Sequence, residues 1–340
     1  MSEGLSLVEL LKKKYKRFYH GHTMPELQYG SCGLLSLDMA MGGGLPRGRI
    51  IQLYGPPSSG KSTLAFTFVR AFQRRQEPCV YIDLEGTGQR NDMQRHQLIE
   101  DETFNYATPP DGEEAISMAL DAAECGARLV VIDSVPYLRS KATLEKDVGE
   151  RSFAAVSSLI SNNLNRLTHT FRTTNSILLL INQLRANTDA GRYGPTTKPS
   201  GGSALQYLSS LSLSISRRQK MDDGEGIISV VRADKTKIAA AFQEVELYIY
   251  YHSGISEVHD LFATLSKLNL IQRSGAYYSL SQEAAEQLNC EARLGKGSEA
   301  VMTWLEQNPH FRQELHRLAL AQLANLTPEG DDGDVSTLEG

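Results

Sequence analysis

A glycine- and serine-rich segment, residues 55–63, contains the residue types with the clearest chemistry. Its sequence, Gly-Pro-Pro-Ser-Ser-Gly-Lys-Ser-Thr, fits the phosphate-loop pattern G-x-x-x-x-G-K-[S/T]. An apolar, β-leaning run (50–54) precedes it, and a helical pattern (64–71) follows it. The glycines let backbone N–H groups point at phosphate oxygens, and the start of the helix adds a partial positive charge. This context predicts a nucleotide-binding site, whereas the alternative is an ordinary glycine-rich turn.

Within this loop, two side chains have distinct expected roles. Lys61 would neutralise the β- and γ-phosphates, and the Ser62 hydroxyl would bind Mg²⁺. All nine residues are candidates for contact with the nucleotide: Gly55, Pro56, Pro57, Ser58, Ser59, Gly60, Lys61, Ser62 and Thr63.

Polar side chains end three further apolar runs. In a parallel sheet, the carboxyl ends of neighbouring strands line the ligand crevice. The run 129–133 ends in Asp133, which would hold Mg²⁺ directly or through water; the alternative is an Asp that caps the next turn. The run 79–83 is followed by Glu85, our candidate for orienting and deprotonating the attacking water, whereas Asp83 is expected to be structural.

The fourth run, 177–182, is followed by Gln183. A carboxamide at that place can hydrogen-bond the γ-phosphate, so it would distinguish a nucleoside triphosphate from a diphosphate. We therefore expect Gln183 to act as a sensor of the bound nucleotide.

The composition is that of a soluble globular protein. The 340 residues are 41% hydrophobic and 22% charged, with a net charge of −5, which does not by itself indicate a nucleic-acid binder. The four cysteines are scattered without a C-x-x-C pair, which argues against a zinc site and for a reducing compartment. We find no stretch typical of a signal peptide or a membrane span, so a cytoplasmic protein is expected.

The order of apolar runs predicts an α/β fold. Strand candidates 50–54, 79–83, 129–133 and 177–182 alternate with helical stretches 61–75, 112–125 and 151–170. This alternation is typical of a mostly parallel sheet flanked by helices. Strand-like segments then follow one another through 211–251, which indicates an antiparallel extension at the sheet edge.

The two ends of the chain read differently from its middle. Residues 5–19 are predicted to form a helix, and residues from 327 onward are rich in glycine and acid and expected to be disordered. We therefore divide the chain into an N-terminal helix and linker (1–30), a phosphate-loop core (31–256), a small C-terminal α/β domain (257–326) and an acidic tail (327–340).

Together these segments resemble the RecA-type recombinases of bacteria and phages. The resemblance covers most of the chain, and its strength lies in the shared order and spacing of many short motifs. They are 36–38, 44–50, 55–63, 82–85, 131–135, 181–183, 200–205, 235–240, 275–279 and 304–309. The resemblance implies a phosphate-loop NTPase core of RecA type, with an ATPase core over 31–256 that carries the DNA-binding loops and an N-terminal oligomerisation helix within 1–30.

The resemblance implies an activity and partners. Members of this family form helical filaments of identical subunits on single-stranded DNA, hydrolyse ATP with Mg²⁺, and pair and exchange strands with double-stranded DNA. Two loops, about 144–155 and 184–203, would contact DNA; the second reads as long and structureless, and an ordinary surface loop is the alternative. Candidate DNA-binding residues are Arg151, Phe153, Arg185, Arg192, Tyr193, Lys198, Gly201 and Gly202; a core position is the alternative for Phe153.

A lysine pair completes the expected catalytic set. Lys235 and Lys237 match the family's pair that reaches the ATP of the neighbouring subunit, so that hydrolysis depends on assembly. Two features depart from the family: residues 86–92 show no evident match to its usual carboxylate and stacking tyrosine for adenine, and Ser158 stands where an arginine is usual. Two other classes stay open: a RecA-like regulatory DNA-binding ATPase without strand exchange, and a ring-forming DNA motor.

Overall fold

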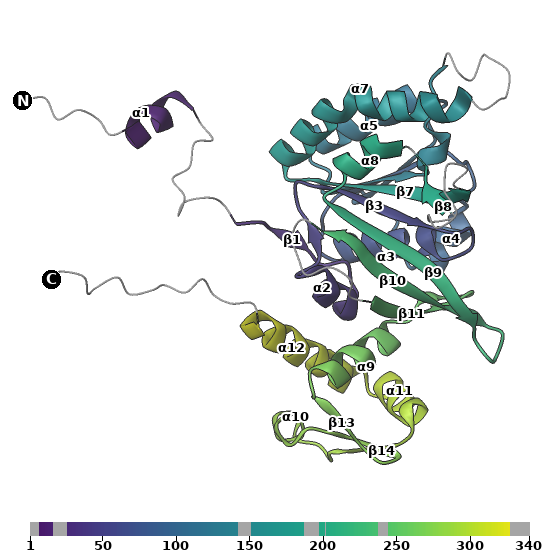
Figure 1. The fold of residues 1–340 in the computed structure, drawn as a ribbon. Coiled ribbons are helices and arrows are strands. Elements are labelled where there is room, and N and C mark those ends of the chain that lie inside the picture. Colours follow the sequence, from purple (N-terminus) through teal and green to yellow (C-terminus); the bar gives the residue numbers. More distant parts are fainter. Residues whose placement is uncertain are drawn as a thin grey trace, which may run out of the picture.

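The computed structural model describes residues 7–15, 26–141, 151–186, 197–200, 202–236 and 244–326, and the statements below concern these residues. Its centre is a ten-stranded sheet in which nine strands run in the order β12-β11-β10-β9-β3-β7-β6-β4-β5, with β8 paired to β7 (Figure 1). In that order, the strands are β12 (Gly254–Ile255), β11 (Glu244–Tyr250), β10 (Gly226–Thr236), β9 (Leu211–Lys220), β3 (Ile50–Gly55), β7 (Ile177–Ala186), β6 (Leu129–Asp133), β4 (Cys79–Asp83) and β5 (Phe104–Ala107); β8 is Thr197–Pro199.

The strand directions confirm the predicted division of the sheet. Strands β9, β3, β7, β6, β4 and β5 pair in parallel, whereas β9 to β12 pair antiparallel. The parallel strands are apolar along their whole length because both of their faces are covered. The antiparallel strand β11 instead alternates exposed and buried residues, as expected when only one face packs on the core.

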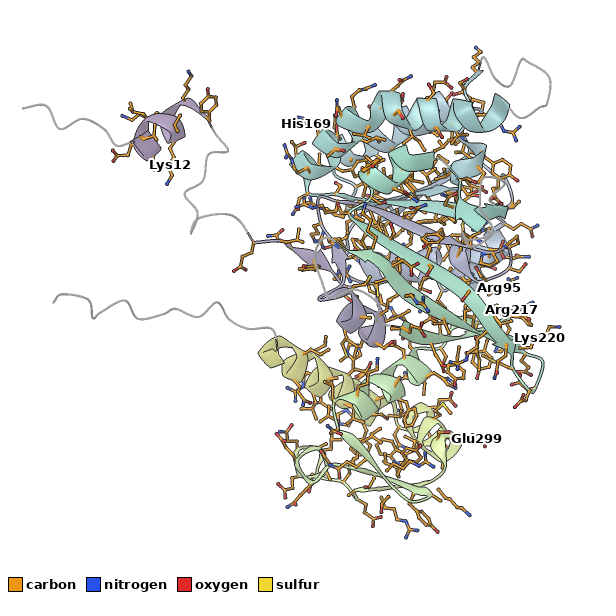
Figure 2. All side chains as sticks on the ribbon, in the orientation of Figure 1. Lys12, Arg95, His169, Arg217, Lys220 and Glu299 are labelled. Atoms are coloured by element: carbon orange, nitrogen blue, oxygen red, sulfur yellow. The ribbon has the colours of Figure 1, made fainter. Side chains whose placement is uncertain are left out.

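Helices cover the parallel strands on both sides (Figure 1). One face packs against α2 (Leu35–Met41) and α3 (Lys61–Gln73) in a core that includes Leu64, Phe68 and Phe72. The other face packs against α5 (Gly112–Glu124), α7 (Arg151–Thr174), α8 (Gly202–Leu208) and the short 3-10 helix η2 (Val135–Tyr137). Figure 2 shows side chains filling both layers.

The remaining elements form a C-terminal module and small additions to the core. The module has its own apolar core around Leu265, Leu305 and Leu315. Its elements are α9 (Glu257–Lys267), β13 (Ile271–Ser274), β14 (Tyr277–Leu280), α10 (Gln282–Leu288), β15 (Arg293–Lys296), α11 (Ser298–Gln307) and α12 (Pro309–Leu326). The additions are α4 (Arg90–Arg95) and the two-stranded sheet of β1 (Tyr29–Gly30) and β2 (Leu45–Pro46), whereas α1 (Leu7–Lys14) contains no buried residue.

Three predicted boundaries need correction. The N-terminal helix covers Leu7–Lys14, and Tyr15 already lies outside it. The segment 184–203 is not structureless, because β7 continues to Ala186 and pairs with β8, with Leu184 opposite Pro199. Helix α7 begins at Arg151, so the end of the first predicted loop is helical. Backbone hydrogen bonds, which leave no hydrophobic pattern in the sequence, form the β7–β8 pair.

Candidate nucleotide site

The phosphate loop joins the end of β3 to the first residue of α3, as the sequence predicts. Its shape depends on two glycines because neighbouring strands press against it. A Cβ on Gly55 would lie 2.0 Å from the carbonyl oxygen of Ile215, and one on Gly60, whose φ is +96°, would lie 2.5 Å from Ile249. The Ser229 hydroxyl also donates to the carbonyl of Ser59 at 2.9 Å. Strands β9, β10 and β11 therefore contact the phosphate loop and restrict its conformation.

Lys61 lies in the hollow of this loop. Its ammonium donates to the carbonyl oxygens of Gly55 at 3.2 Å and Pro56 at 2.7 Å. Burial lowers the pKa of Lys61, while the nearby carboxylates Asp133 and Glu85 oppose that shift. The cation is thus already placed where phosphate oxygens would reach the loop.

Asp133 lies on the side of the site where we expect the metal. Its Oδ2 accepts hydrogen bonds from the hydroxyls of Ser62 at 2.8 Å and Tyr81 at 2.6 Å. Burial raises the pKa of Asp133 to about 6, and the two hydroxyl donors act against this. A buried carboxylate beside a serine hydroxyl supplies the oxygen ligands that Mg²⁺ prefers, so these residues fit the ion.

The described residues contain no group of three or more His, Cys, Asp or Glu side chains that could hold a metal on their own. Mg²⁺ at Asp133 and Ser62 would therefore need phosphate and water oxygens to complete its shell, which is how this ion usually binds with nucleotides.

Glu85 and Gln183 meet across the mouth of the site. Glu85 Oε1 accepts from Gln183 Nε2 at 2.9 Å and from the Ser134 hydroxyl at 2.6 Å. Both side chains line a cavity of about 300 Å³ together with Lys61, Ser62 and Asp133. The fold thus gathers the side chains for which we expected phosphate, metal, water and sensor roles.

Asp83 faces the segment behind Glu85. It accepts hydrogen bonds from the backbone N–H groups of Glu85, Gly86 and Gly88, each at 2.9 Å, and from the Tyr106 hydroxyl. These bonds fix the turn that carries Glu85, so the contacts of Asp83 are those of a structural residue.

The segment after Gln183 is tied to the same strand end. Asn182 Nδ2 donates to the carbonyl of Ser200 at 2.7 Å, and the backbone N–H of Ser200 donates to the carbonyl of Gln183 at 3.3 Å. The β7–β8 pairing therefore starts directly after Gln183, where Leu184 of β7 lies opposite Pro199 at the end of β8. A shift at Gln183 would act directly on the base of the β7–β8 hairpin.

Lys235 lies away from the phosphate loop of its own subunit. Its ammonium donates to the carbonyls of Gln206 and Ser209, the latter at 3.1 Å, at the end of α8. In the strand register, Lys235 of β10 pairs with Ser212 of β9, and Ser212 pairs with Gln52 of β3. Lys235 is therefore two strands away from the strand that carries Gly55 and, along the strand direction, roughly 10 Å from Gly55.

The candidate DNA-binding residues are described only in part. Arg192, Tyr193 and Gly201 lie outside the described residues, as does Lys237 of the lysine pair. The backbone places the others around the hairpin and the first turns of two helices: Arg151 and Phe153 in α7, Arg185 in β7, Lys198 in β8 and Gly202 in α8.

Aromatic residues that the sequence reasoning did not select line a second cavity, of about 180 Å³, beside the phosphate loop. Phe66 stacks on Tyr81 and on His96, with ring centroids 4.7 Å and 5.1 Å apart. Arg95 and Asp92 of α4 also line this cavity. The alternation of β4 could have identified Tyr81, since it precedes Asp83 by two residues and faces the same side.

Comparison with known protein families agrees with this arrangement. The family model described as the RecA N-terminal domain matches residues 15–256, and the RecA C-terminal domain matches residues 260–323. Together they cover most of the chain. None of the described helices is long and apolar enough to cross a membrane.

Proposed function

This chain belongs to the RecA family, and we propose that it is a cytoplasmic, ATP-dependent recombinase that polymerises on single-stranded DNA. In this proposal it pairs that strand with homologous double-stranded DNA and exchanges strands. It hydrolyses ATP to ADP and phosphate with Mg²⁺, in a reaction that depends on bound DNA and on contact between identical subunits.

The observation that carries the proposal is the hydrogen bond between Glu85 and Gln183 beside the phosphate loop. An enzyme that only hydrolyses a nucleotide would need the Glu85 carboxylate but not the Gln183 carboxamide. Gln183 binds this carboxylate and directly precedes the β7–β8 pairing, so it would link the γ-phosphate physically to a segment expected to contact DNA.

The side chains suggest a division of work in hydrolysis. Glu85 would accept a proton from the attacking water as the bond between the γ-phosphorus and the bridging oxygen breaks. Lys61 would stabilise charge on the β- and γ-phosphate oxygens, and Ser62 and Asp133 would hold the metal. When bound, Mg²⁺ neutralises the negative charge that develops on the phosphates. Gln183 Nε2 would exchange its bond to Glu85 for one to the γ-phosphate.

We further propose that Lys235 and Lys237 act on the nucleotide of a neighbouring subunit. The contacts of Lys235 with the end of α8, far from its own phosphate loop, support action in trans. Mixing a Lys237→Ala protein with a Lys61→Ala protein tests this, because some mixed interfaces unite an intact loop with an intact lysine pair. Partial recovery of ATP hydrolysis is expected. No recovery at any ratio, in filaments proven to be mixed, would contradict action in trans.

Strand exchange itself is tested with circular single-stranded DNA and homologous linear duplex. The wild-type protein should form joint molecules with ATP, whereas Lys61→Ala should form none. Negative-stain images with a slowly hydrolysed ATP analogue should show helical filaments. Discrete rings would favour a DNA motor, and DNA binding with hydrolysis but no joint molecules would favour a regulatory ATPase.

A further inference from the structure

Strand β10 has an irregularity immediately before Lys235. Its pairing with β9 shifts register at this point: Ala233 pairs with Leu213, whereas Lys235 pairs with Ser212, the neighbouring residue of β9. Two residues of β10 thus advance against one residue of β9, and Asp234 is the extra residue of a β-bulge. A bulge changes the direction of the side chains that follow it.

The bulge decides which face of the sheet Lys235 reaches. Successive residues of a strand face opposite sides, so in a regular strand Lys235 would lie on the same side as Ala233, which belongs to the apolar core. With the bulge, Lys235 faces the side covered by α8, where its ammonium donates to the carbonyls of Gln206 and Ser209. The bulge therefore keeps this cation out of the core.

Asp234 is bound by Tyr54, the residue before Gly55 of the phosphate loop. The Tyr54 hydroxyl donates to Asp234 Oδ2 at 2.5 Å. In the ladder, Tyr54 pairs with Ser214 of β9, and Ser214 pairs with Arg232 of β10, so the tyrosine side chain reaches across β9. Burial, together with the hydrogen bond to Asp234 and its charge, raises the pKa of Tyr54, so the hydroxyl keeps its proton and stays a donor.

The same tyrosine adjoins the strand that ends at the sensor. In the parallel pair of β3 and β7, Tyr54 is level with Asn182, and Gly55 is level with Gln183. The contact between Tyr54 and Asp234 therefore connects the start of a subunit's phosphate loop to the strand end that carries its lysines.

We propose that Asp234 is a positioning residue for the lysine pair, because its hydrogen bond with Tyr54 holds the bulge that directs Lys235 away from the core. This inference rests on the proposed action of Lys235 and Lys237 on the nucleotide of a neighbouring subunit. Without the hydrogen bond the lysines are still present but are no longer held in place. A misplacement of about 1 Å can slow a reaction about a hundredfold.

The test is complementation in mixed filaments. Asp234→Ala removes the acceptor, so kcat for DNA-dependent ATP hydrolysis should fall about tenfold or more, while KM for ATP should change little. A mixture of Asp234→Ala with Lys61→Ala should regain hydrolysis, because some interfaces unite the intact phosphate loop of the first protein with the correctly held lysines of the second. The recovery should match that of Lys237→Ala mixed with Lys61→Ala in the same ratio.

Two failures of this experiment have different meanings. If Asp234→Ala shows no recovery while Lys237→Ala does, Asp234 supports the phosphate loop of its own subunit, and the inference is wrong although action in trans stands. If neither mixture recovers in filaments proven to be mixed, action in trans is contradicted and the inference falls with it. An unchanged kcat in Asp234→Ala would also overturn the inference.

Tyr54→Phe is the second variant, because it keeps the ring and removes only the hydroxyl. Its kcat should fall as much as that of Asp234→Ala, and the double variant should be no slower than either single one, since all three lack the same hydrogen bond. Asp234→Asn keeps an oxygen acceptor for the hydroxyl, so its kcat should lie closer to the wild type than to Asp234→Ala. A wild-type kcat in Tyr54→Phe would overturn the inference.

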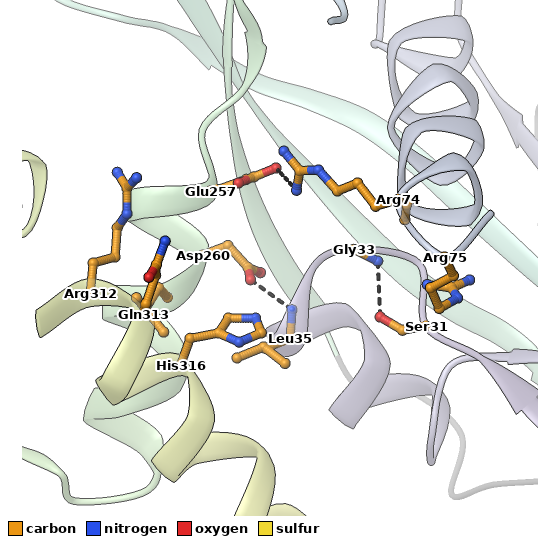
Figure 3. A pocket seen from close by; sticks show the side chains of 12 residues that line it. Ser31, Gly33, Leu35, Arg74, Arg75, Glu257, Asp260, Arg312, Gln313 and His316 are labelled. Atoms are coloured by element: carbon orange, nitrogen blue, oxygen red, sulfur yellow. Dashed lines mark hydrogen bonds and ion pairs between the residues drawn. The ribbon is translucent and has the colours of Figure 1, made fainter. Parts of the chain in front are cut away.

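Asp260→Asn is the matched control for a loss of stability. Asp260 also links distant parts of the chain, since it accepts from the backbone N–H groups of Leu35 at 2.7 Å and Ser36 at 3.2 Å at the junction with the C-terminal module (Figure 3). Asp260→Asn should be destabilised and yet keep normal hydrolysis, which would assign the slow hydrolysis of Asp234→Ala to misplaced lysines. An equal loss of hydrolysis in both variants would contradict the positioning role.

Discussion

The nucleotide site and the junction between core and C-terminal module each contain a deeply buried aspartate. Asp133 and Asp260 are both more than nine-tenths buried, and burial raises the pKa of each to about 6. Their partners differ. Asp133 accepts from two side-chain hydroxyls, whereas Asp260 accepts from two backbone N–H groups and the Ser36 hydroxyl.

This difference in hydrogen-bond partners distinguishes Asp133, a candidate metal ligand, from Asp260, which links two parts of the fold. A hydroxyl can rotate and offer its own oxygen to a cation, so the Asp133 carboxylate can exchange a hydrogen bond for a metal bond. Backbone N–H groups at the start of α2 have fixed directions and nothing but a donor to offer. Asp260 therefore ties α9 of the C-terminal module to the core and has no comparable freedom.

The largest effect is expected at the nucleotide site. Lys61→Ala should lower DNA-dependent ATP hydrolysis at least about a hundredfold, because it removes the cation aimed at the phosphates. The variant should lose this activity without a comparable loss in its free energy of unfolding. A phosphate-release assay measures the loss, with the exposed Lys267→Ala as a control that keeps normal activity. Normal hydrolysis in Lys61→Ala would show that the loop is not the active one.

Glu85→Gln should also act on turnover rather than on the fold. The carboxamide oxygen can still accept from Ser134 and Gln183, but it cannot take a proton from water, so kcat should fall by about a hundredfold or more. Nucleotide affinity should be kept, and filaments should persist longer with ATP. An unchanged kcat would move the catalytic role to another group, with Asp83 as the next candidate.

Gln183→Ala should leave ATP binding intact and weaken its coupling to DNA. The wild-type protein should bind single-stranded DNA more tightly with an ATP analogue than with ADP, and this ratio should approach one in the variant. Fluorescence anisotropy with labelled oligonucleotide measures both affinities. A ratio equal to that of the wild type would remove the sensor role from Gln183.

The smallest effect on activity is expected at the junction. In Asp260→Asn, the side-chain NH₂ group faces the backbone N–H of Leu35 or Ser36, so that N–H loses its acceptor. The free energy of unfolding should therefore fall by about 1–3 kcal/mol. The rate of ATP hydrolysis should stay near that of the wild type. Urea unfolding measures the change, and a loss of hydrolysis without a loss of stability would place Asp260 in the catalytic machinery.

The raised pKa of Asp260 predicts that the stability of the protein depends on pH. The native pKa of Asp260, about 6, exceeds its ordinary value of 3.8, so between these pH values the native state holds a proton that the unfolded state has released. The stability that Asp260 supplies therefore falls as the pH rises through this window. The gap in unfolding free energy between wild type and Asp260→Asn should be larger at pH 5 than at pH 7. An equal gap would show that the pKa of Asp260 is not raised.

The central strands and the phosphate loop were predictable because their physics is local. Strands buried on both faces require continuous apolar runs, and β3, β4 and β6 lie where those runs are. Strands β5 and β8 were missed for the opposite reason. The first is a short, half-buried edge strand, and the second is recognisable only by the backbone bonds that pair it with β7.

The residues that could bind phosphate are recognisable without a structure, since the loop's glycines and Lys61 lie within a single segment. The different roles of the carboxylates, in contrast, depend on contacts between distant parts of the chain. Glu85 meets Ser134 and Gln183, which are 49 and 98 residues away, while Asp83 meets the backbone of its own turn. Hydrogen-bond partners select the role of a carboxylate, and here parallel pairing of strands distant in the chain brings those partners together.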